Sequence, residues 1–233
     1  MNRSVLITGG SRGIGRAIAE SFLAQGDKVA TISRTGDGPE GALLLKGDVI
    51  DAEQVDAAFK EAEDSHGPVE VLVSNAGITR DNLLTLMSPD DFRDVIDTNL
   101  TAPALLAKRA LRGMMKARKG RIVLIGSAVA LAGEAGQANY AAAKAGLIGL
   151  ARSVAREYGR RGITANVVSP GLTATDMASE LNEAQVEKLL AKTPVGRMAT
   201  PQEIADAVLF LASPAAAYIT GVVLPVDGGA SMH

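Results

Sequence analysis

The sequence predicts an α/β protein with a single doubly wound layer, in which a mostly parallel sheet of seven strands has helices on both faces. Short, nearly continuous apolar runs alternate with longer helix-like segments along the whole chain, as expected for strands buried on both faces of a parallel sheet. No linker, internal repeat or low-complexity segment interrupts this alternation. We therefore expect one domain over residues 1–233, which is long enough to bury a substantial core.

Seven apolar runs are the expected strands. They lie at residues 4–8, 28–33, 42–46, 69–73, 122–125, 163–168 and 222–226. Glycine, proline or small polar residues follow most of these runs. Ligands of open α/β sheets bind outside the carboxyl ends of the strands. The residues that follow the runs are therefore the first candidates for a functional site.

The segments between the runs contain helix start and stop signals. Gly26 and Gly67 end the first two helical segments, and Thr200 with Glu203 caps the last. The expected helices cover residues 16–25, 51–66, 81–118 with a break near Ser88, 140–160 and 200–212. Residues 172–192 are rich in small polar and acidic side chains, and we expect a mobile lid with a helix there.

Composition excludes several classes of function. A net charge of -2 gives no general attraction to nucleic acid or to an anionic membrane. The chain has no cysteine and two histidines, so it offers neither thiolate chemistry nor a histidine-rich metal site, and we predict no metal. No apolar run reaches the roughly 20 residues of a membrane span. The sequence thus predicts a soluble, cytoplasmic protein.

A glycine-rich turn directly follows the first expected strand. Its G-x-x-x-G-x-G spacing and the helix after it are the context in which backbone N–H groups receive a pyrophosphate. Glycines also occur in tight turns that bind nothing, but the position after the strand favours a Rossmann-type dinucleotide site. The turn residues predicted to bind the cofactor are Gly9, Ser11, Arg12, Gly13, Ile14 and Gly15.

The exit of the second strand indicates which nicotinamide cofactor fits. An NAD site usually has an acidic residue there, whereas the 2′-phosphate of NADPH requires cations. Arg34 stands at this exit and Arg12 lies in the glycine turn, so NADPH is favoured. Both could instead be ordinary surface residues. Asp37 follows closely and could bind a ribose, which leaves NADH open.

Two further strand exits contain candidate cofactor residues. Asp48 and Val49 follow the third strand, where a carboxylate could accept from an adenine amino group or simply serve a turn. The fourth strand is followed by the small residues Asn75, Ala76 and Gly77, which would let the backbone approach a flat ligand. A plain strand-to-loop turn is the alternative.

Ser127, Tyr140 and Lys144 form the candidate catalytic group. Tyr140 and Lys144 are four residues apart and so share a helix face. An ammonium beside a phenol favours the phenolate, so we expect Lys144 to lower the pKa of Tyr140 toward neutrality. Ser127, at a strand end, could then hold a carbonyl or alcohol oxygen. Taken alone, the Tyr–Lys pair could equally be two helix neighbours without chemistry.

Several spaced elements, in a fixed order, resemble the short-chain dehydrogenase/reductase family over essentially the whole chain. They are Thr8, Gly9, Gly13, Gly15, Asn75, Ala76, Gly77, Asn99, Ser127, Tyr140, Lys144, Pro170 and Gly171. One departure is Ser74, where many members of the family have Asn.

The resemblance implies a role for each matching residue. Tyr140 would be the general acid/base, Ser127 would position the reacting oxygen, and Lys144 would lower the Tyr140 pKa and bind the nicotinamide ribose. Asn99, awkward in a helix interior on propensity, would anchor a water in a proton relay. The resemblance adds further cofactor contacts at Asp48, Val49, Asn75, Ala76, Gly77, Pro170, Gly171 and Thr173.

Within the family, residues 77–84, 136–147 and 217–221 are most similar to the 3-oxoacyl-(acyl-carrier-protein) reductases of fatty-acid synthesis. This implies NADPH-dependent reduction of a 3-oxoacyl thioester to the 3R-hydroxyacyl product. The same residues would serve an acetoacetyl-CoA reductase, a polyketide ketoreductase or a sugar-alcohol dehydrogenase. A non-catalytic NADP-sensing protein is a more distant alternative, because a fold alone does not determine function.

The resemblance also implies partners. Arg118 and Arg161 match positions at which such reductases recruit the acidic acyl-carrier protein, and clustered cations suit such docking. Exposed arginines at helix ends can equally stay solvated and complement the helix dipole. The family tends to be homotetrameric, through the long helices around residues 90–118 and 138–160. A monomer core could use the same apolar residues.

Overall fold

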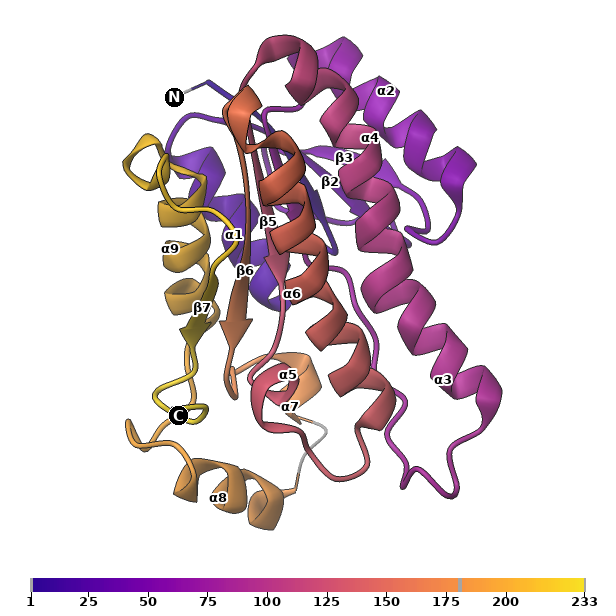
Figure 1. Cartoon of the computed structure of the whole chain (residues 1–233), viewed down its shortest axis with the longest axis vertical. Helices are drawn as coiled ribbons and strands as arrows, with labels where there is room; N and C mark the ends of the chain where they lie inside the picture. The colour runs from indigo at the N-terminus through magenta and orange to yellow at the C-terminus, as the bar shows by residue number, and fades with distance from the viewer. Residues whose placement is uncertain (1, 180–181, 233) are drawn as a thin grey trace.

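A computed structural model describes residues 2–179 and 182–232. Within this part of the chain, seven strands form one sheet in the order β3-β2-β1-β4-β5-β6-β7, and each neighbouring pair is parallel (Figure 1). The strands are β1 Ser4–Thr8, β2 Lys28–Ser33, β3 Leu43–Lys46, β4 Val71–Ser74, β5 Gly120–Ile125, β6 Ile163–Pro170 and β7 Val223–Val226. The predicted doubly wound sheet is confirmed, and the described sheet is wholly parallel rather than mostly so.

Helices cover both faces of the sheet. They are α1 Gly13–Ala24, α2 Ala52–His66, α3 Pro89–Ile96, α4 Ala102–Ala117, α5 Val129–Ala132, α6 Ala138–Tyr158, α7 Asp176–Ser179, α8 Glu183–Ala191 and α9 Pro201–Ala212. The core residues of α2, α4 and α6 pack on one face, and those of α1 and α9 pack on the other (Figure 1). In the described residues, no helix combines the length and the apolar character needed to cross a membrane.

Alternate residues of the central strands enter two separate cores. Leu6 and Leu72 point to the core that contains Phe59, whereas Ile7 and Val73 point to the core that contains Phe22. All of these side chains are fully buried, and each contributes about 1.5–3 kcal/mol through removal of apolar surface from water. Burial on both faces explains why the strands are continuous apolar runs in the sequence.

A buried ion pair closes the edge at which the strands begin. The Arg3 guanidinium contacts the Asp27 carboxylate at 2.6 Å and donates from Nη1 to the Ala212 carbonyl oxygen at 2.6 Å. The same guanidinium lies 5.5 Å from the centre of the Phe22 ring. These contacts tie the start of β1 to the turn before β2 and to the end of α9.

The predicted helix over residues 81–118 is partly wrong. Residues 81–88 are irregular, and α3 begins at Pro89. The predicted break near Ser88 is confirmed: Ser88 is extended, as a residue before proline tends to be, and its hydroxyl caps the helix by accepting from the Asp91 N–H. The preceding apolar residues do not reach a core, and three of them are exposed: Leu83 (57%), Leu84 (66%) and Leu86 (68%).

Candidate active site

The predicted site residues gather at the carboxyl edge, the edge of the sheet formed by the C-terminal ends of the strands. The loops after β1, β4, β5 and β6 meet there, and Figure 1 shows this edge beside α5 and α7. The strand order reverses between β1 and β4, which is the point where open α/β sheets bind nucleotides. The predicted residues that lie within two positions of a strand end at this edge are Gly9, Arg34, Asp48, Asn75, Ser127 and Gly171.

The glycine turn is packed too closely to hold side chains at some of its positions. A Cβ on Gly15 would lie 2.1 Å from the Gly9 carbonyl oxygen, so a side chain does not fit there. Gly9 and Gly13 have φ angles of +70° and +54°, which glycine adopts without strain. Helix α1 has no side-chain cap at Arg12 and no acidic residue in its first turn. Its N-terminal N–H groups therefore suit an anion.

The two predicted phosphate-binding arginines are both exposed. Arg34 stands at the exit of β2, as predicted. Arg12 contacts Asp176 at 3.3 Å, and both side chains are largely exposed. This contact joins the glycine turn to α7, in the segment predicted to be a lid. The lid prediction also covers residues 180–181, which lie outside the described residues.

Asn75 holds the glycine turn in place. Its Nδ2 donates to the carbonyl oxygens of Thr8 and Gly9, each at 3.1 Å. The Thr8 hydroxyl accepts from the backbone N–H groups of Asn75 and Ala76, at 3.0 and 3.1 Å. The loop after β4 is thus fixed to the loop after β1, and the two form one continuous wall of the site.

The adenine-side residues lie at the exit of β3. Val49 is buried in the core, whereas Asp48 is partly exposed. The Asp48 carboxylate accepts from the Ile50 N–H at 3.2 Å, and the Asp48 N–H donates to Gln54 at 2.9 Å. These bonds are those of a turn residue, which was one of the two alternatives for Asp48. They leave lone pairs on the carboxylate for a further donor.

Ser127, Tyr140 and Lys144 come from two adjoining elements. Ser127 follows β5, and its hydroxyl accepts from the Val129 N–H at 3.2 Å, which fixes the start of α5. Tyr140 and Lys144 are on the first turns of α6. Lys144 is 4% exposed, donates to the Ile125 carbonyl oxygen at 2.7 Å and places its Nζ 5.6 Å from the centre of the Tyr140 ring. The three side chains therefore meet beside the end of β5.

The predicted lowering of the Tyr140 pKa is wrong in this structure. Burial raises the pKa of Tyr140 to about 12, although a side-chain hydrogen bond with Ser127 acts in the opposite direction. The negative charge of Asp81 raises this pKa further. Burial also lowers the pKa of Lys144 to about 8. Desolvation is the largest influence on the pKa of both groups, so at neutral pH the phenol keeps its proton and Lys144 remains mainly charged.

Asn99 is fully buried in a π-helical turn, Asp97–Thr101, between α3 and α4. Its Oδ1 accepts from the Ile78 N–H at 3.0 Å, and its Nδ2 donates to the Ile78 carbonyl oxygen at 2.8 Å. A Cβ on Gly77 would lie 2.5 Å from Asn99 Oδ1 and 3.6 Å from Lys144 Nζ. The poor helix propensity of Asn99 is thus offset by two bonds to the loop after β4, and π turns of this kind are frequent at functional sites.

Comparison with known proteins adds to this geometry. The family model described as enoyl-(acyl carrier protein) reductase matches residues 9–231. The 3-oxoacyl-(acyl-carrier-protein) reductase FabG of Vibrio cholerae serotype O1 is 50% identical over 235 residues, which cover 97% of this chain and 96% of that protein. The corresponding reductase MabA of Mycobacterium avium is 50% identical over 232 residues, covering 100% of this chain and 91% of that protein. The chain belongs to the short-chain dehydrogenase/reductase family.

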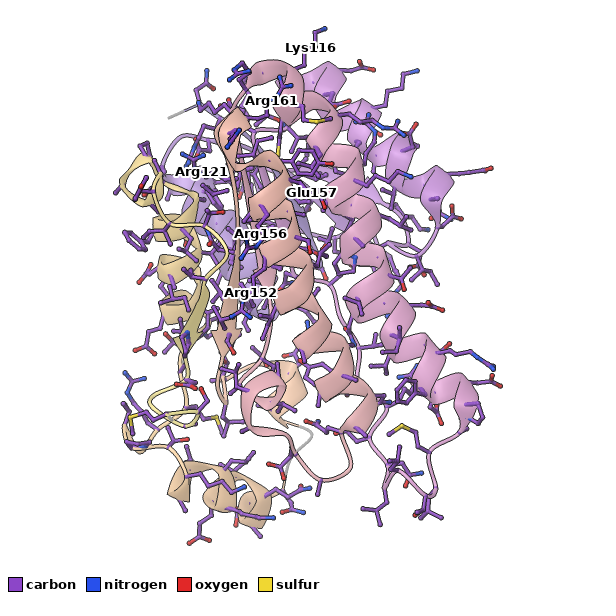
Figure 2. All side chains as sticks on the ribbon, in the orientation of Figure 1. Lys116, Arg121, Arg152, Arg156, Glu157 and Arg161 are labelled. Carbon is purple, nitrogen blue, oxygen red and sulfur yellow. The ribbon has the colours of Figure 1, made fainter. Side chains whose placement is uncertain are left out.

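In this short-chain reductase, Arg118 and Arg161 lie far from Tyr140. They stand just before β5 and β6, at the edge where the strands begin, whereas Tyr140 is near the start of α6. Figure 2 shows Arg161 at the end of α6 that is remote from the catalytic edge. The 21 residues of α6 span about 31 Å. Arg118 donates to the Arg160 carbonyl oxygen at 3.4 Å, and both Arg118 and Arg161 are exposed.

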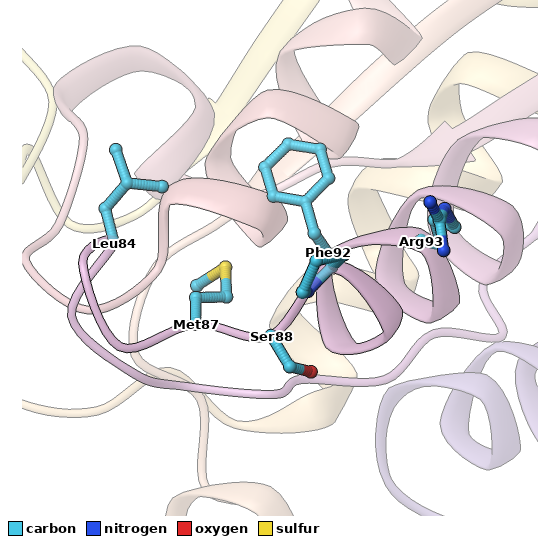
Figure 3. Close-up of a pocket in the computed structure, with 6 residues that line it drawn as sticks. Leu84, Met87, Ser88, Phe92 and Arg93 are labelled. Carbon is cyan, nitrogen blue, oxygen red and sulfur yellow. The ribbon is translucent and has the colours of Figure 1, made fainter.

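A shallow apolar pocket of ≈ 320 Å³ lies on the irregular segment and α3 (Figure 3). Its lining residues are Leu84, Met87, Ser88, Pro89, Phe92 and Arg93. None of the predicted site residues lines this pocket, so we do not assign it to the reaction.

Three residues of the short-chain reductase site were given no contact or chemical role in the sequence analysis, although Thr8 is among the residues that carry the family resemblance. Thr8 accepts a hydrogen bond from Asn75, and Ile78 accepts one from Asn99. The Ile125 carbonyl oxygen accepts a hydrogen bond from the Lys144 ammonium. Ile78 and Ile125 act through the backbone, which leaves no signal in the side-chain pattern. A fourth residue, Asn139, precedes Tyr140, and its contacts are described below.

Proposed function

We propose that this protein reduces a 3-oxoacyl thioester attached to acyl-carrier protein to the 3R-hydroxyacyl thioester, with NADPH as the reductant. The main support is the meeting of Ser127, Tyr140 and Lys144 beside an uncapped helix N-terminus at the strand-order switch. The names of the relatives, which are about 50% identical, support the choice of substrate. Fatty-acid synthesis is the pathway that the sequence resemblance implies.

The residues present fit a dinucleotide. The glycine turn packs so closely against its neighbours that Gly9 and Gly15 leave no room for a side chain, and the α1 N-terminus offers uncapped N–H donors to a diphosphate. Arg12 and Arg34 would hold the 2′-phosphate, and Lys144, next to Gly77, would hold the nicotinamide ribose. The chemistry that NADPH supplies when bound is hydride transfer to the keto carbon.

The proton comes from the protein. The Ser127 hydroxyl holds the substrate carbonyl oxygen, and Tyr140 donates its phenol proton to this oxygen as negative charge develops there. A phenol with a pKa of about 12 is protonated at neutral pH and is still a much stronger acid than a secondary alcohol, so the transfer is favourable. The Lys144 ammonium stabilises the phenolate that remains, and the Asn99 turn lies where a water could return the proton.

Substrate screening and one variant test this proposal. Purified protein should oxidise NADPH with 3-oxoacyl thioesters, and Tyr140→Phe should lower kcat by about 10²–10⁴-fold, because proton transfer is lost. NADPH binding, followed by nucleotide fluorescence, should survive in this variant. Unchanged turnover would exclude Tyr140 as the proton donor, and a non-catalytic nucleotide sensor would show binding without turnover.

The choice of substrate has four rivals, which a wider substrate panel separates. Faster turnover of a 2-enoyl thioester would favour carbon–carbon reduction, which the description of the matching family model names. Equal turnover of acetoacetyl-CoA and the carrier-bound thioester would favour an acetoacetyl-CoA reductase, and preference for a polyketide or sugar alcohol would point to the remaining rivals. A strong preference for the carrier-bound 3-oxo thioester is the expected result.

We also propose that Arg118 and Arg161 dock the carrier for the site of a second subunit in a homotetramer. Within one chain the two arginines are at the wrong end of α6, whereas an antiparallel contact between α6 helices would bring them beside a neighbouring Tyr140. A protein with both arginines changed to Glu should lose turnover of the carrier substrate but keep acetoacetyl-CoA turnover.

Mixed oligomers test docking across subunits. Co-expressed Tyr140→Phe chains and Arg118→Glu/Arg161→Glu chains should regain carrier turnover, because one chain docks and the other reduces. Absence of any regain in mixed oligomers would mean that docking and catalysis use the same chain.

The cytoplasmic location of the protein stays a prediction.

A further inference from the structure

Asn139 is a fully buried asparagine that directly precedes Tyr140 in the first turn of α6. Its Oδ1 accepts from the Tyr140 N–H at 2.7 Å. Its Nδ2 donates to the Arg80 carbonyl oxygen at 2.9 Å and lies 3.4 Å from the Asp91 carbonyl oxygen. One side chain thus joins the start of α6, the loop after β4 and the start of α3.

The start of α6 depends on this side chain for a hydrogen-bond partner. The first N–H groups of a helix have no partner within the helix, and a side chain at the N-cap position usually supplies one. Gln137 is the N-cap residue of α6, but it makes no cap bond and instead donates to Asp81 at 2.7 Å. The Tyr140 N–H therefore donates to the Asn139 Oδ1, and the Asn139 Nδ2 in turn contacts the carbonyl oxygens of Arg80 and Asp91.

The loop that Asn139 holds is also held from the opposite side. Asn99 binds both backbone groups of Ile78, only two residues before Arg80. The next residue, Asp81, is close enough for its charge to act on the Tyr140 phenol. Two buried amides therefore fix this short loop between the π-helical turn and α6, and a shift of the loop would change both the place and the surroundings of the phenol.

We propose that Asn139 is a positioning residue for Tyr140: its amide holds the first turn of α6 against Arg80 and Asp91 and so sets where the phenol lies relative to Ser127. Its effect on turnover rests on the function proposed above. Asn139 does not touch the reacting atoms, and its influence passes through Tyr140.

Asn166 provides a matched control within the same chain. It is also fully buried, its Nδ2 donates to the Ile219 carbonyl oxygen at 2.9 Å, and its Oδ1 accepts from the Val222 N–H at 3.2 Å. It lies within β6 and binds the loop before β7 rather than the loops around Tyr140. Asn139→Ala and Asn166→Ala should both lower stability, because each leaves buried backbone groups without partners.

Turnover and a tyrosine signal separate positioning from a merely structural role. The chain has three tyrosines, so ring-labelled tyrosine gives few NMR signals, and Tyr140→Phe identifies the one from Tyr140. Asn139→Ala should lower kcat by roughly 10- to 100-fold with little change in the KM for NADPH, because misplacement of a reacting group costs rate rather than affinity. It should also move the Tyr140 signal and the pH dependence of kcat. Asn166→Ala should change none of these.

Asn139→Ser is a second variant in case Asn139→Ala fails to fold. Serine is favoured at helix N-termini and adds no charge, but its short side chain cannot make the bonds of Asn139 to the two carbonyl oxygens. It should lower kcat and move the Tyr140 signal as the alanine variant does. Wild-type kcat and an unmoved signal in folded Asn139 variants would overturn the proposal, as would equal changes in Asn166→Ala. If the wild-type protein reduces no thioester, the proposed function fails, and the Tyr140 signal alone decides the positioning role.

Discussion

Lys144 is a buried charge whose effect on stability can be measured. Lys144→Met removes the ammonium and keeps an unbranched side chain of similar length. Burial lowers the pKa of Lys144 from its ordinary value of 10.5 to about 8, so the folded chain binds this proton less tightly than the unfolded chain does. Each pKa unit corresponds to about 1.4 kcal/mol. The lowered pKa of Lys144 therefore lowers the free energy of unfolding by about 3 kcal/mol at neutral pH.

The pH dependence isolates this effect from other consequences of the substitution. Between about pH 8 and pH 10.5 the unfolded chain holds a proton on Lys144 that the folded chain has released, so the contribution of Lys144 to stability becomes more favourable with pH across this window. The methionine variant lacks the group and should show no such contribution. The loss of the bond to the Ile125 carbonyl is nearly independent of pH. The difference between the two free energies of unfolding should therefore change by up to about 3 kcal/mol.

Urea unfolding followed by circular dichroism, from neutral pH to pH 10.5, measures this difference. Protein concentration is held constant and no nucleotide is added, because subunit association and ligand binding both shift apparent stability. Lys116→Met is the control, because Lys116 is exposed on α4 and should give no comparable change. A difference between wild type and Lys144→Met that stays constant with pH would refute the reasoning that burial governs the ionisation of Lys144.

Three further predictions concern the cofactor site, the Asn99 turn and the contact between α2 and α4. Arg34→Asp should shift the ratio of kcat/KM values from NADPH toward NADH by roughly 10- to 100-fold, because a charged hydrogen bond to the phosphate is lost; no shift would mean that the phosphate binds elsewhere. Asn99→Ala should lower the free energy of unfolding by about 1–3 kcal/mol for each Ile78 group left without a partner, measured by urea unfolding, and a neutral result would contradict the buried contact. Arg109→Met should lower the free energy of unfolding by roughly 1–3 kcal/mol in the same assay, because Arg109 binds Asp56 at 2.7 Å and Glu63 through two nitrogens. Equal stability of variant and wild type would show that solvent replaces these bonds.

Local patterns were enough to predict the strands and the glycine turn. The run that became β1 and the glycines after it are adjacent in sequence, so their spacing already determines a strand, a turn and a helix start. The family resemblance then selected Ser127, Tyr140 and Lys144, and the structure places these three side chains together beside the end of β5. Their chemical roles stay predictions.

Burial and long-range contacts were not available from the sequence. The spacing of Tyr140 and Lys144 predicts an attraction between the two groups, but the direction of the Tyr140 pKa depends on how much water reaches the phenol. Residues 81–88 include apolar side chains that could line a helix, yet Leu83, Leu84 and Leu86 are exposed, and the helix begins at Pro89 instead. Asn139 was visible in the sequence beside Tyr140, but its partners Arg80 and Asp91 are 59 and 48 residues away.

The Arg3–Asp27 pair also has a practical consequence for handling the enzyme. Because it anchors the first strand at the edge opposite Tyr140, a polypeptide or surface linker fused ahead of Asn2 emerges on the side away from the reacting groups. Protein immobilised through such a fusion should leave the nucleotide entrance of the same chain facing the bulk solution.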